Sequence, residues 1–330
     1  MKEILNYLFE YKTLTKEKAY EVLLNISREK YNESEMAAFM TVFIMRSITV
    51  QELSGFREAL LDLCLKIDLG RNDNLDIVGT GGDGKNTFNI STASSFVVAG
   101  AGVKVSKHGN RSASSVSGSS NVMKFMGYEF KQEEDKLRKE LDKAGICFLH
   151  APLFHPALKV VAPIRKQLGV RTFFNVMGPL VNPTFPKYQM LGVYNLEVAR
   201  IYNYLFQKTD KKFTIVYSMD GYDEISLTAD TRFIDNEGEK NCTPEELGKR
   251  SVKPSDIYGG KTVEDASKIF LNVLKGEATP AQTAVVLANA ASGIRCAGLY
   301  QDYEDCYQAA RESIDSGKAY GVLKKLIELQ

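Results

Sequence analysis

The sequence predicts an α/β protein in two parts: a small all-helical domain and a large α/β domain with a mainly parallel central sheet flanked by helices. Residues 2 to about 66 show helical hydrophobic periodicity throughout. From about residue 75 onward, short apolar runs typical of strands alternate with helical segments, an order that builds parallel sheets covered by helices. The chain has 330 residues, more than one compact core usually serves, so we expect two domains.

Four helices are expected in the N-terminal region, at about residues 4–9, 15–26, 34–45 and 49–67. Thr15 is a candidate cap for the second helix, Ser34 for the third, and Thr49 with Glu52 has capping-box spacing for the fourth. The third helix carries more apolar residues over 37–45 than one buried face needs. We therefore expect this domain to provide the interface of a homodimer; a bundle that buries these residues itself is the alternative.

In the larger domain, strands are expected at residues 75–78, 103–106, 146–149, 188–193, 213–217, 231–234 and 240–242. Helices are expected at residues 92–101, 112–126, 133–144, 196–209, 243–247, 263–275, 279–297 and 302–329, the last interrupted near 316. Prolines break the stretch after residue 150 into turns and a short helix, 157–168. The segment of about 157–183 is predicted to rejoin the N-terminal helices. The expected domains are therefore 1–68 with about 157–183, and 69–156 with 184–330.

Charge and cysteine content narrow the function. Lys and Arg number 42 and Asp and Glu 41, and the resulting net charge of +1 argues against a general nucleic-acid-binding surface. The five cysteines have no metal-ligand spacing, and their odd number predicts reduced thiols. The first residues lack the layout of a signal peptide, and no apolar run approaches membrane-spanning length. We therefore expect a cytoplasmic protein with no membrane partner.

Three glycines follow the first predicted strand and precede a helix. They lie within Gly79–Gly82, directly after the apolar run 75–78, and Asn89 or Ser91 can cap the helix that follows. Glycine takes positive φ freely and lets backbone amides approach a ligand closely. Strand, glycine turn and helix start together place N–H donors and the positive end of the helix dipole against an anion such as phosphate. A single cluster of this kind is as often a plain tight turn.

The same arrangement is predicted a second time. A strand at about 103–106 is followed by a charged turn, Lys107–Arg111, and by a hydroxyl-rich helix start, Ser112–Ser115. Lys107 and Arg111 would add positive charge that a neutral sugar would not need. The doubled unit therefore predicts a ligand with more than one phosphate group.

Asp223 and Glu224 are the strongest candidates for metal ligands. They follow the predicted strand 213–217 in a glycine-containing turn, and adjacent carboxylates suit Mg²⁺, which prefers oxygen ligands and often bridges to phosphate. A solvated acidic turn is the alternative, and the neighbouring phosphate site favours the metal. The Ser91 hydroxyl, at a helix start beside phosphate, is a third candidate ligand.

The remaining candidates are an arginine and the histidines. Arg165 could hold a carboxylate in two parallel hydrogen bonds, or it is an ordinary surface cation. His108 lies in the basic turn, so we expect it in the pocket, whereas His150 and His155 flank a proline turn and are explained as well by structural or surface roles. The sequence has no Cys–His, Ser–His–Asp or GxSxG pattern, and we expect no covalent catalysis.

The motifs occur together in one known family. Over nearly the whole chain, the sequence resembles the anthranilate phosphoribosyltransferase family, in the motifs Gly79–Asp83, Asn89–Thr92, Lys107–Ser112, Arg171–Pro183, Asp223–Glu224, Asn289–Ala291 and Asp315–Ala319. The resemblance implies the fold shared with pyrimidine nucleoside phosphorylases, usually as a homodimer. It also implies transfer of the phosphoribosyl group of 5-phosphoribosyl 1-pyrophosphate (PRPP) to the amine of anthranilate. The products are N-(5-phosphoribosyl)anthranilate and pyrophosphate, on the route to tryptophan.

The resemblance also implies roles for individual residues. Those expected to contact PRPP are Gly79, Gly82, Asp83, Thr87, Asn89, Ile90, Ser91, Thr92, Lys107, His108, Gly109, Asn110, Arg111, Ser112, Ala113, Ser114, Ser115 and Ser119. Those expected to contact anthranilate are Gly79, Asn110 and Arg165. Two Mg²⁺ ions would be held by Ser91, Asp223 and Glu224, and Lys107, His108 and Asn110 would position the reactants. One departure is Asn121, where the family more usually has an acidic residue, and it bears on helix capping rather than on activity.

Two other functions remain possible from the residues. A pyrimidine nucleoside phosphorylase shares the fold, but it would not need an acid-binding arginine or an acidic metal pair. A non-catalytic nucleic-acid-binding protein would need a broad basic surface, which a net charge of +1 does not favour.

Overall fold

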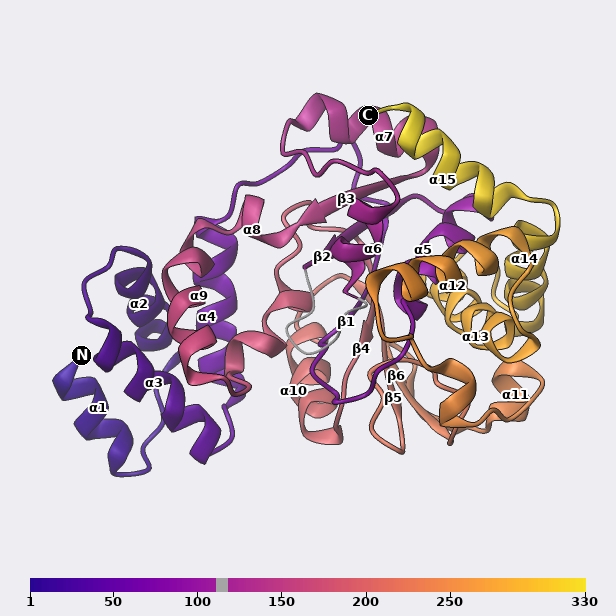
Figure 1. Ribbon diagram of the computed structural model, residues 1–330. Coiled ribbons are helices and arrows are strands. Elements are labelled where there is room, and N and C mark those ends of the chain that lie inside the picture. The colour runs from indigo at the N-terminus through magenta and orange to yellow at the C-terminus, as the bar shows by residue number, and fades with distance from the viewer. Residues whose placement is uncertain (111–117) are drawn as a thin grey trace. The chain divides into compact units, whose positions relative to one another are not determined.

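The structure, a computed structural model, describes residues 1–110 and 118–330 of the chain. The chain forms two compact units, Met1–Ile67 with Ala151–Pro183 and Asp68–His150 with Thr184–Gln330 (Figure 1). The segment that rejoins the N-terminal helices begins at Ala151, earlier than the expected 157. The turn before residue 157 belongs with these helices because the amide of Leu65 donates a hydrogen bond to the carbonyl of Phe154 at 2.8 Å.

The first unit is helical. Its α-helices are α1 (Lys2–Phe9), α2 (Lys16–Ser27), α3 (Glu33–Met45), α4 (Val50–Leu63), α8 (Ala151–Phe154) and α9 (Pro156–Leu168), and two 3-10 turns follow at Phe173–Val176 and Gly178–Leu180. Aromatic side chains fill its core: Phe56 stacks on Phe173 with ring centres 4.7 Å apart, and Phe39 packs edge-on against both. The two segments of this unit, distant in sequence, therefore share one core.

The predicted helix caps are partly right. Thr15 caps α2, and Thr49 forms the expected reciprocal pair with Glu52 at the start of α4. The third helix starts one residue earlier than expected, at Glu33, because Asn32 rather than Ser34 caps it and exchanges hydrogen bonds with Glu35. The fourth ends at Leu63 instead of continuing to about 67.

The second unit has a seven-stranded sheet in the order β3-β2-β1-β4-β5-β6-β7. The strands are β1 (Leu75–Gly79), β2 (Val105–Gly109), β3 (Ile146–His150), β4 (Tyr188–Gly192), β5 (Lys212–Ser218), β6 (Thr231–Asp235) and β7 (Gly238–Cys242). The first five in the sheet order are parallel, and β6 and β7 are antiparallel. The fold class of a helical domain plus an α/β domain with a mainly parallel sheet is confirmed.

Helices cover this sheet. They are α5 (Ile90–Gly100), α6 (Ser119–Phe125), α7 (Glu134–Ala144), α10 (Leu196–Phe206), α11 (Pro244–Gly248), α12 (Val263–Lys275), α13 (Pro280–Cys296), α14 (Tyr303–Asp315) and α15 (Lys318–Glu328), with a 3-10 turn at Pro254–Ile257. The central helix α5 is buried along most of its length and packs against α13 and α15 (Figure 1). A small residue permits the approach to α15, since a Cβ at Gly100 would lie 2.8 Å from the backbone nitrogen of Ala319.

Some predicted boundaries in this unit are wrong. The second strand begins at Val105 rather than 103 and continues through Gly109, so most of the predicted charged turn is strand. Helix α5 starts at Ile90 rather than at 92, and Asn89 occupies the cap position without the side-chain cap hydrogen bond that was expected. Of the helix predicted over 112–126, the structure describes only α6, because residues 111–117 lie outside its described range. In the described part of the chain, none of the helices combines the length and the apolar character needed to span a bilayer.

Candidate active site

The site is built where parallel strands end. Strands β1 and β4 pair in register through Gly79 and Gly192, and β2 and β3 pair through Gly109 and His150. In a parallel sheet all carboxyl ends meet at one edge, where ligands commonly bind. The glycine loop after β1, the start of α5 and the turn after β5 are therefore neighbours.

Asp223 reaches the glycine loop from the turn after β5. One of its carboxylate oxygens, Oδ2, accepts a hydrogen bond from the amide of Gly81 at 2.6 Å. Two glycines make room for it: a Cβ at Gly79 would lie 2.3 Å from Asp223 Oδ2, and a Cβ at Gly192 would lie 1.6 Å from the Asp223 carbonyl oxygen. Any side chain at these positions would displace the acid.

Glu224 contacts the first turn of α5. Its Oε1 accepts a hydrogen bond from the amide of Ser91 at 2.9 Å, and its Oε2 lies 3.5 Å from the Thr87 hydroxyl. The structure therefore brings together the acidic pair and the serine that the sequence suggested as metal ligands.

The acids at this edge disfavour one another's charge. Burial, and after it the nearby carboxylate of Asp83, raise the pKa of Asp223 to about 7. Burial and the charge of Asp223 raise the pKa of Glu224 well above its usual range, and burial raises that of Asp83 as well. A bound divalent cation would relieve this repulsion, so the donor set fits Mg²⁺.

The acids do not form a closed metal cage. Within residues 1–110 and 118–330, no three His, Cys, Asp or Glu side chains converge as a complete metal site. Mg²⁺ is commonly held by one or two carboxylates and takes its other ligands from water and phosphate. The pair therefore fits an ion that arrives with a phosphorylated ligand.

Lys107 lies in a different environment from the one that the sequence predicted. It is a residue of β2 with a side chain only 2% exposed, rather than a cation in an exposed turn. Its Nζ donates to the carbonyl of Ile77 at 2.5 Å and lies 3.4 Å from the Ser91 hydroxyl. Burial, partly offset by the charges of Asp76 and Glu224, lowers the pKa of Lys107 to about 8. Its charge therefore acts from inside the sheet, beneath the start of α5.

The other residues of the second predicted phosphate unit are only partly described. His108 is buried in β2, and its amide donates to Asp76 Oδ1 at 3.1 Å. The Ser119 hydroxyl donates to the carbonyl of Asn110 at 3.3 Å, which places Ser119 at the end of β2. The predicted contacts Arg111, Ser112, Ala113, Ser114 and Ser115 lie outside the described residues.

Arg165 lies on α9 in the helical unit, with its guanidinium half-buried. One nitrogen, Nη2, donates to the side-chain oxygen of Asn175 at 3.3 Å, and the guanidinium carbon lies 5.6 Å from the centre of the Phe174 ring. Burial lowers the pKa of Arg165. In the described part of the chain it forms no ion pair with an acidic side chain. A half-buried cation with a neutral partner is suited to bind an anion.

The sequence analysis did not predict that residues 258–259 pack against the loop between β1 and α5. Residue Thr87 forms a β-bridge with Tyr258, and the amide of Gly259 donates to the carbonyl of Asn86 at 2.8 Å. A Cβ at Gly259 would lie 2.4 Å from the Thr87 carbonyl oxygen. The adjacent glycines at 259 and 260 were a signal of close backbone packing in the sequence. The loop that Gly259 packs against lies far away in the sequence, so its identity could not be predicted.

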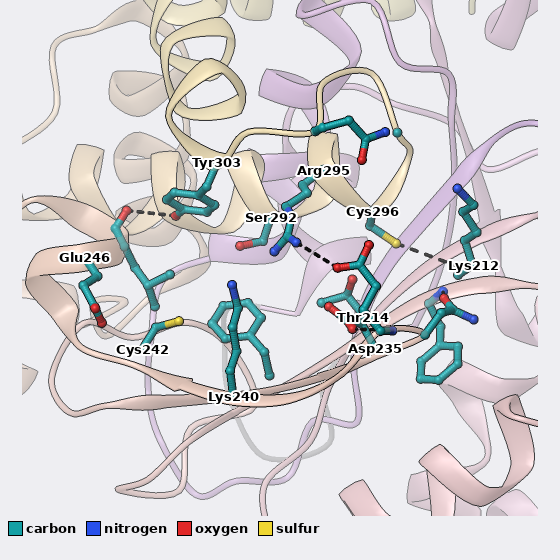
Figure 2. Close-up of a pocket in the computed structure, with 17 residues that line it drawn as sticks. Lys212, Thr214, Asp235, Lys240, Cys242, Glu246, Ser292, Arg295, Cys296 and Tyr303 are labelled. Atoms are coloured by element: carbon teal, nitrogen blue, oxygen red, sulfur yellow. Dashed lines mark hydrogen bonds and ion pairs between the residues drawn. The ribbon is translucent and has the colours of Figure 1, made fainter.

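A cavity of about 300 Å³ lies elsewhere in the α/β unit, between the β5–β7 edge of the sheet and α13 (Figure 2). None of the described residues that line it is a predicted site residue. Its charged side chains balance, with Lys212, Lys240 and Arg295 against Asp235, Glu237 and Glu246. Arg295 pairs with Glu237 at 3.3 Å. This cavity therefore favours no charged ligand of one sign.

Known proteins similar to this chain support a common family. A family model described as "Glycosyl transferase family, helical bundle domain" matches residues 2–64, and one described as "Glycosyl transferase family, a/b domain" matches residues 71–320. The chain is 55% identical over 329 residues to the anthranilate phosphoribosyltransferase of Flavobacterium johnsoniae, covering 100% of this chain and 99% of the relative. It is 53% identical to that of Cytophaga hutchinsonii, covering 99% and 100%.

Solved structures agree with these relatives. The anthranilate phosphoribosyltransferase of Thermus thermophilus superposes with a TM-score of 0.92 at 31% identity, covering 98% of each chain. The Saccharomyces cerevisiae enzyme in complex with PRPP and Mg gives 0.89 at 28% identity, covering 96% of this chain and 93% of that one. The same enzyme in complex with 4-fluoroanthranilate gives 0.85 at 27% identity, with the same coverage.

Proposed function

This chain belongs to the anthranilate phosphoribosyltransferase family, and from that membership we propose how its own residues carry out the reaction. The chain transfers the phosphoribosyl group of PRPP to the amine of anthranilate, which gives N-(5-phosphoribosyl)anthranilate and pyrophosphate in tryptophan biosynthesis. The observation that carries the residue assignments is the meeting of Asp223 and Glu224 with the glycine loop and the first turn of α5.

PRPP binds, in this proposal, across the ends of β1 and β2. The loop Gly79–Asp83 and the start of α5, Asn89–Thr92, offer backbone amides and the positive end of a helix dipole to its phosphates. Asn110 and Ser119 meet at the end of β2 and contact the same ligand. Lys107 contributes its charge from beneath Ser91.

Ser91, Asp223 and Glu224 hold Mg²⁺ in this proposal. When bound, the metal neutralises charge that develops on the leaving pyrophosphate. Two ions are proposed, as the family resemblance implies, and the upward pKa shifts of Asp83, Asp223 and Glu224 support cation binding beside these crowded carboxylates. The S. cerevisiae relative, solved with PRPP and Mg, supports use of this metal.

Anthranilate is recognised through its carboxylate. Arg165 is half-buried with a neutral amide partner, Asn175, and its guanidinium can present two parallel hydrogen bonds to a carboxylate. Gly79 and Asn110 are proposed to contact the rest of the molecule. The ring of Phe174 beside the guanidinium keeps the arginine oriented.

The chemical step requires positioning more than acid–base catalysis. The bond from the ribose C1 to pyrophosphate breaks, with positive charge developing on the sugar and negative charge on the leaving group. The nucleophile is an aromatic amine that is already neutral at pH 7, so no strong base is needed. Lys107, His108 and Asn110 position the reactants, and fixed amides stabilise the leaving charge without reorganising.

The helical unit is proposed to form a homodimer. Exposed apolar side chains cluster on α1 and at the end of α3, with Phe9 58% exposed and Met45 80% exposed. An exposed apolar patch of this kind commonly marks an interface. Light scattering at micromolar protein concentration that gives the mass of a monomer would overturn the proposed homodimer. We also propose that the protein works in the cytoplasm, which its unpaired cysteines support.

The activity is tested by mixing the protein with PRPP, Mg²⁺ and anthranilate and following the loss of anthranilate fluorescence. We expect consumption that stops when either PRPP or Mg²⁺ is omitted. A parallel reaction with thymidine and inorganic phosphate tests the phosphorylase alternative. Phosphorolysis without anthranilate consumption would overturn the proposal.

A further inference from the structure

Two neighbouring serines at the start of α6 contact the ends of two adjacent strands. The Ser119 hydroxyl donates to the carbonyl of Asn110, directly after β2, at 3.3 Å. The Ser120 hydroxyl and Nδ1 of His150, the last residue of β3, lie 3.0 Å apart. The first turn of α6 is therefore attached by side chains to both strand ends.

The two strand ends lie at one level. Strands β2 and β3 are parallel, and Gly109 pairs directly with His150. A Cβ at Gly109 would lie 2.9 Å from the Ser119 hydroxyl, so the serine rests closely on the β2 end. A displacement of α6 at Ser120 would therefore also move Ser119 relative to Asn110.

The imidazole of His150 is itself held in place. Its ring packs on that of Phe130, with ring centres 4.8 Å apart and an angle of 32° between their planes. The Ser120 residue is only 4% exposed, so its hydroxyl has little access to water as a substitute partner. The hydrogen bond forms with either imidazole tautomer, because the hydroxyl can donate or accept.

We propose that His150 is a positioning residue for PRPP. It holds the first turn of α6 through Ser120, so that Ser119 and Asn110 keep the spacing with which they bind PRPP. His150 itself contacts no substrate. The inference rests on the proposed function, because only that proposal assigns Ser119 and Asn110 as residues that contact PRPP.

The test uses variants that separate the hydrogen bond from the packing. His150→Phe keeps an aromatic ring against Phe130 and removes Nδ1, whereas His150→Asn places an amide near the position of Nδ1. Ser120→Ala removes the other partner, and Phe130→Leu alters the packing but leaves the hydrogen bond. Circular dichroism melting establishes that each variant is folded.

We expect His150→Phe and Ser120→Ala each to raise the KM for PRPP about fivefold, the effect of losing one neutral hydrogen bond. The kcat and the KM for anthranilate should change less than about twofold. His150→Asn should recover most of the loss, and Phe130→Leu should raise the KM for PRPP less than His150→Phe does, because a leucine still packs on the imidazole and the hydrogen bond to Ser120 remains. The double variant, His150→Phe with Ser120→Ala, should be no worse than either single one, because both remove the same bond.

An unchanged KM for PRPP in His150→Phe would overturn the inference. So would a His150→Asn variant as impaired as His150→Phe, or a double variant that multiplies the two single effects. PRPP binding with Mg²⁺, measured by calorimetry without anthranilate, gives a second readout. If wild type binds PRPP and consumes anthranilate while the variants match it, only this inference fails. If wild type does neither, the proposed function fails and the inference falls with it.

Discussion

Gly79→Ala is the sharpest test of the proposed metal site. The added Cβ would lie 2.3 Å from Oδ2 of Asp223 and 2.9 Å from its Cγ, closer than non-bonded atoms approach. The Asp223 side chain is short and buried, so it can avoid the methyl group only by rotating away from the loop. That rotation breaks its 2.6 Å hydrogen bond from the amide of Gly81.

The magnitude follows from that bond. A hydrogen bond to a charged group contributes roughly 1.5–3 kcal/mol, which corresponds to about a 10- to 150-fold loss in kcat/KM for PRPP at limiting Mg²⁺. Initial rates of anthranilate consumption, measured over a range of Mg²⁺ concentrations, give this ratio. The loss should be largest at low Mg²⁺, because the displaced acid is a proposed metal ligand.

Gly321→Ala is the matched control. Gly321 lies within α15, and a Cβ there would meet nothing within 4 Å. The variant should keep wild-type kinetics and be stabilised by roughly 0.5–1 kcal/mol, because alanine favours the helix. Wild-type Mg²⁺ dependence in Gly79→Ala would refute the close contact with Asp223, and comparable damage in the control would show that the assay reports general instability.

Three further predictions concern single residues. Asp223→Asn and Glu224→Gln should each lower kcat at limiting Mg²⁺, and unchanged Mg²⁺ dependence in both would contradict their role as ligands. Arg165→Ala should raise the KM for anthranilate at least tenfold while that for PRPP stays nearly constant; equal changes in both would argue against carboxylate recognition. Burial lowers the pKa of His155 to about 4 from 6.5, so the unfolded chain binds the extra proton. The free energy of unfolding should therefore fall by about 3 kcal/mol between pH 6.5 and 4, and denaturant titrations should show a flatter pH dependence for His155→Phe.

Local signals predicted the helices well because their caps are local. Thr243, Thr262 and Thr279 each accept a hydrogen bond from the amide three residues on, a pattern visible in the sequence. Asn32 and Ser34 are both residue types that commonly cap helices, and both lie close to the start of the same stripe of apolar residues. The choice of Asn32 follows from its reciprocal bond with Glu35, which the sequence permits but does not select over its neighbour.

Lys107 could not be placed from the sequence. A run of charged and glycine residues after a short apolar segment is typical of a turn, and Lys is seldom buried. Here pairing with β3 extends the strand through Gly109. Burial is possible because the carbonyl of Ile77 and the hydroxyl of Ser91 accept hydrogen bonds from the ammonium group. Those partners come from other elements, and only the folded chain brings them together.

The glycines illustrate where sequence reasoning stops. Gly81 and Gly82 have φ values of +66° and +72°, as expected for a turn that needs glycine. Gly79 is required for another reason, its contact with Asp223. That contact depends on the strand order β1-β4-β5, which carries the turn after β5 back over the end of β1. Alternation of strands and helices predicts a parallel sheet but does not determine this order, so the acids could be predicted as ligands while the residue that fixes their position could not.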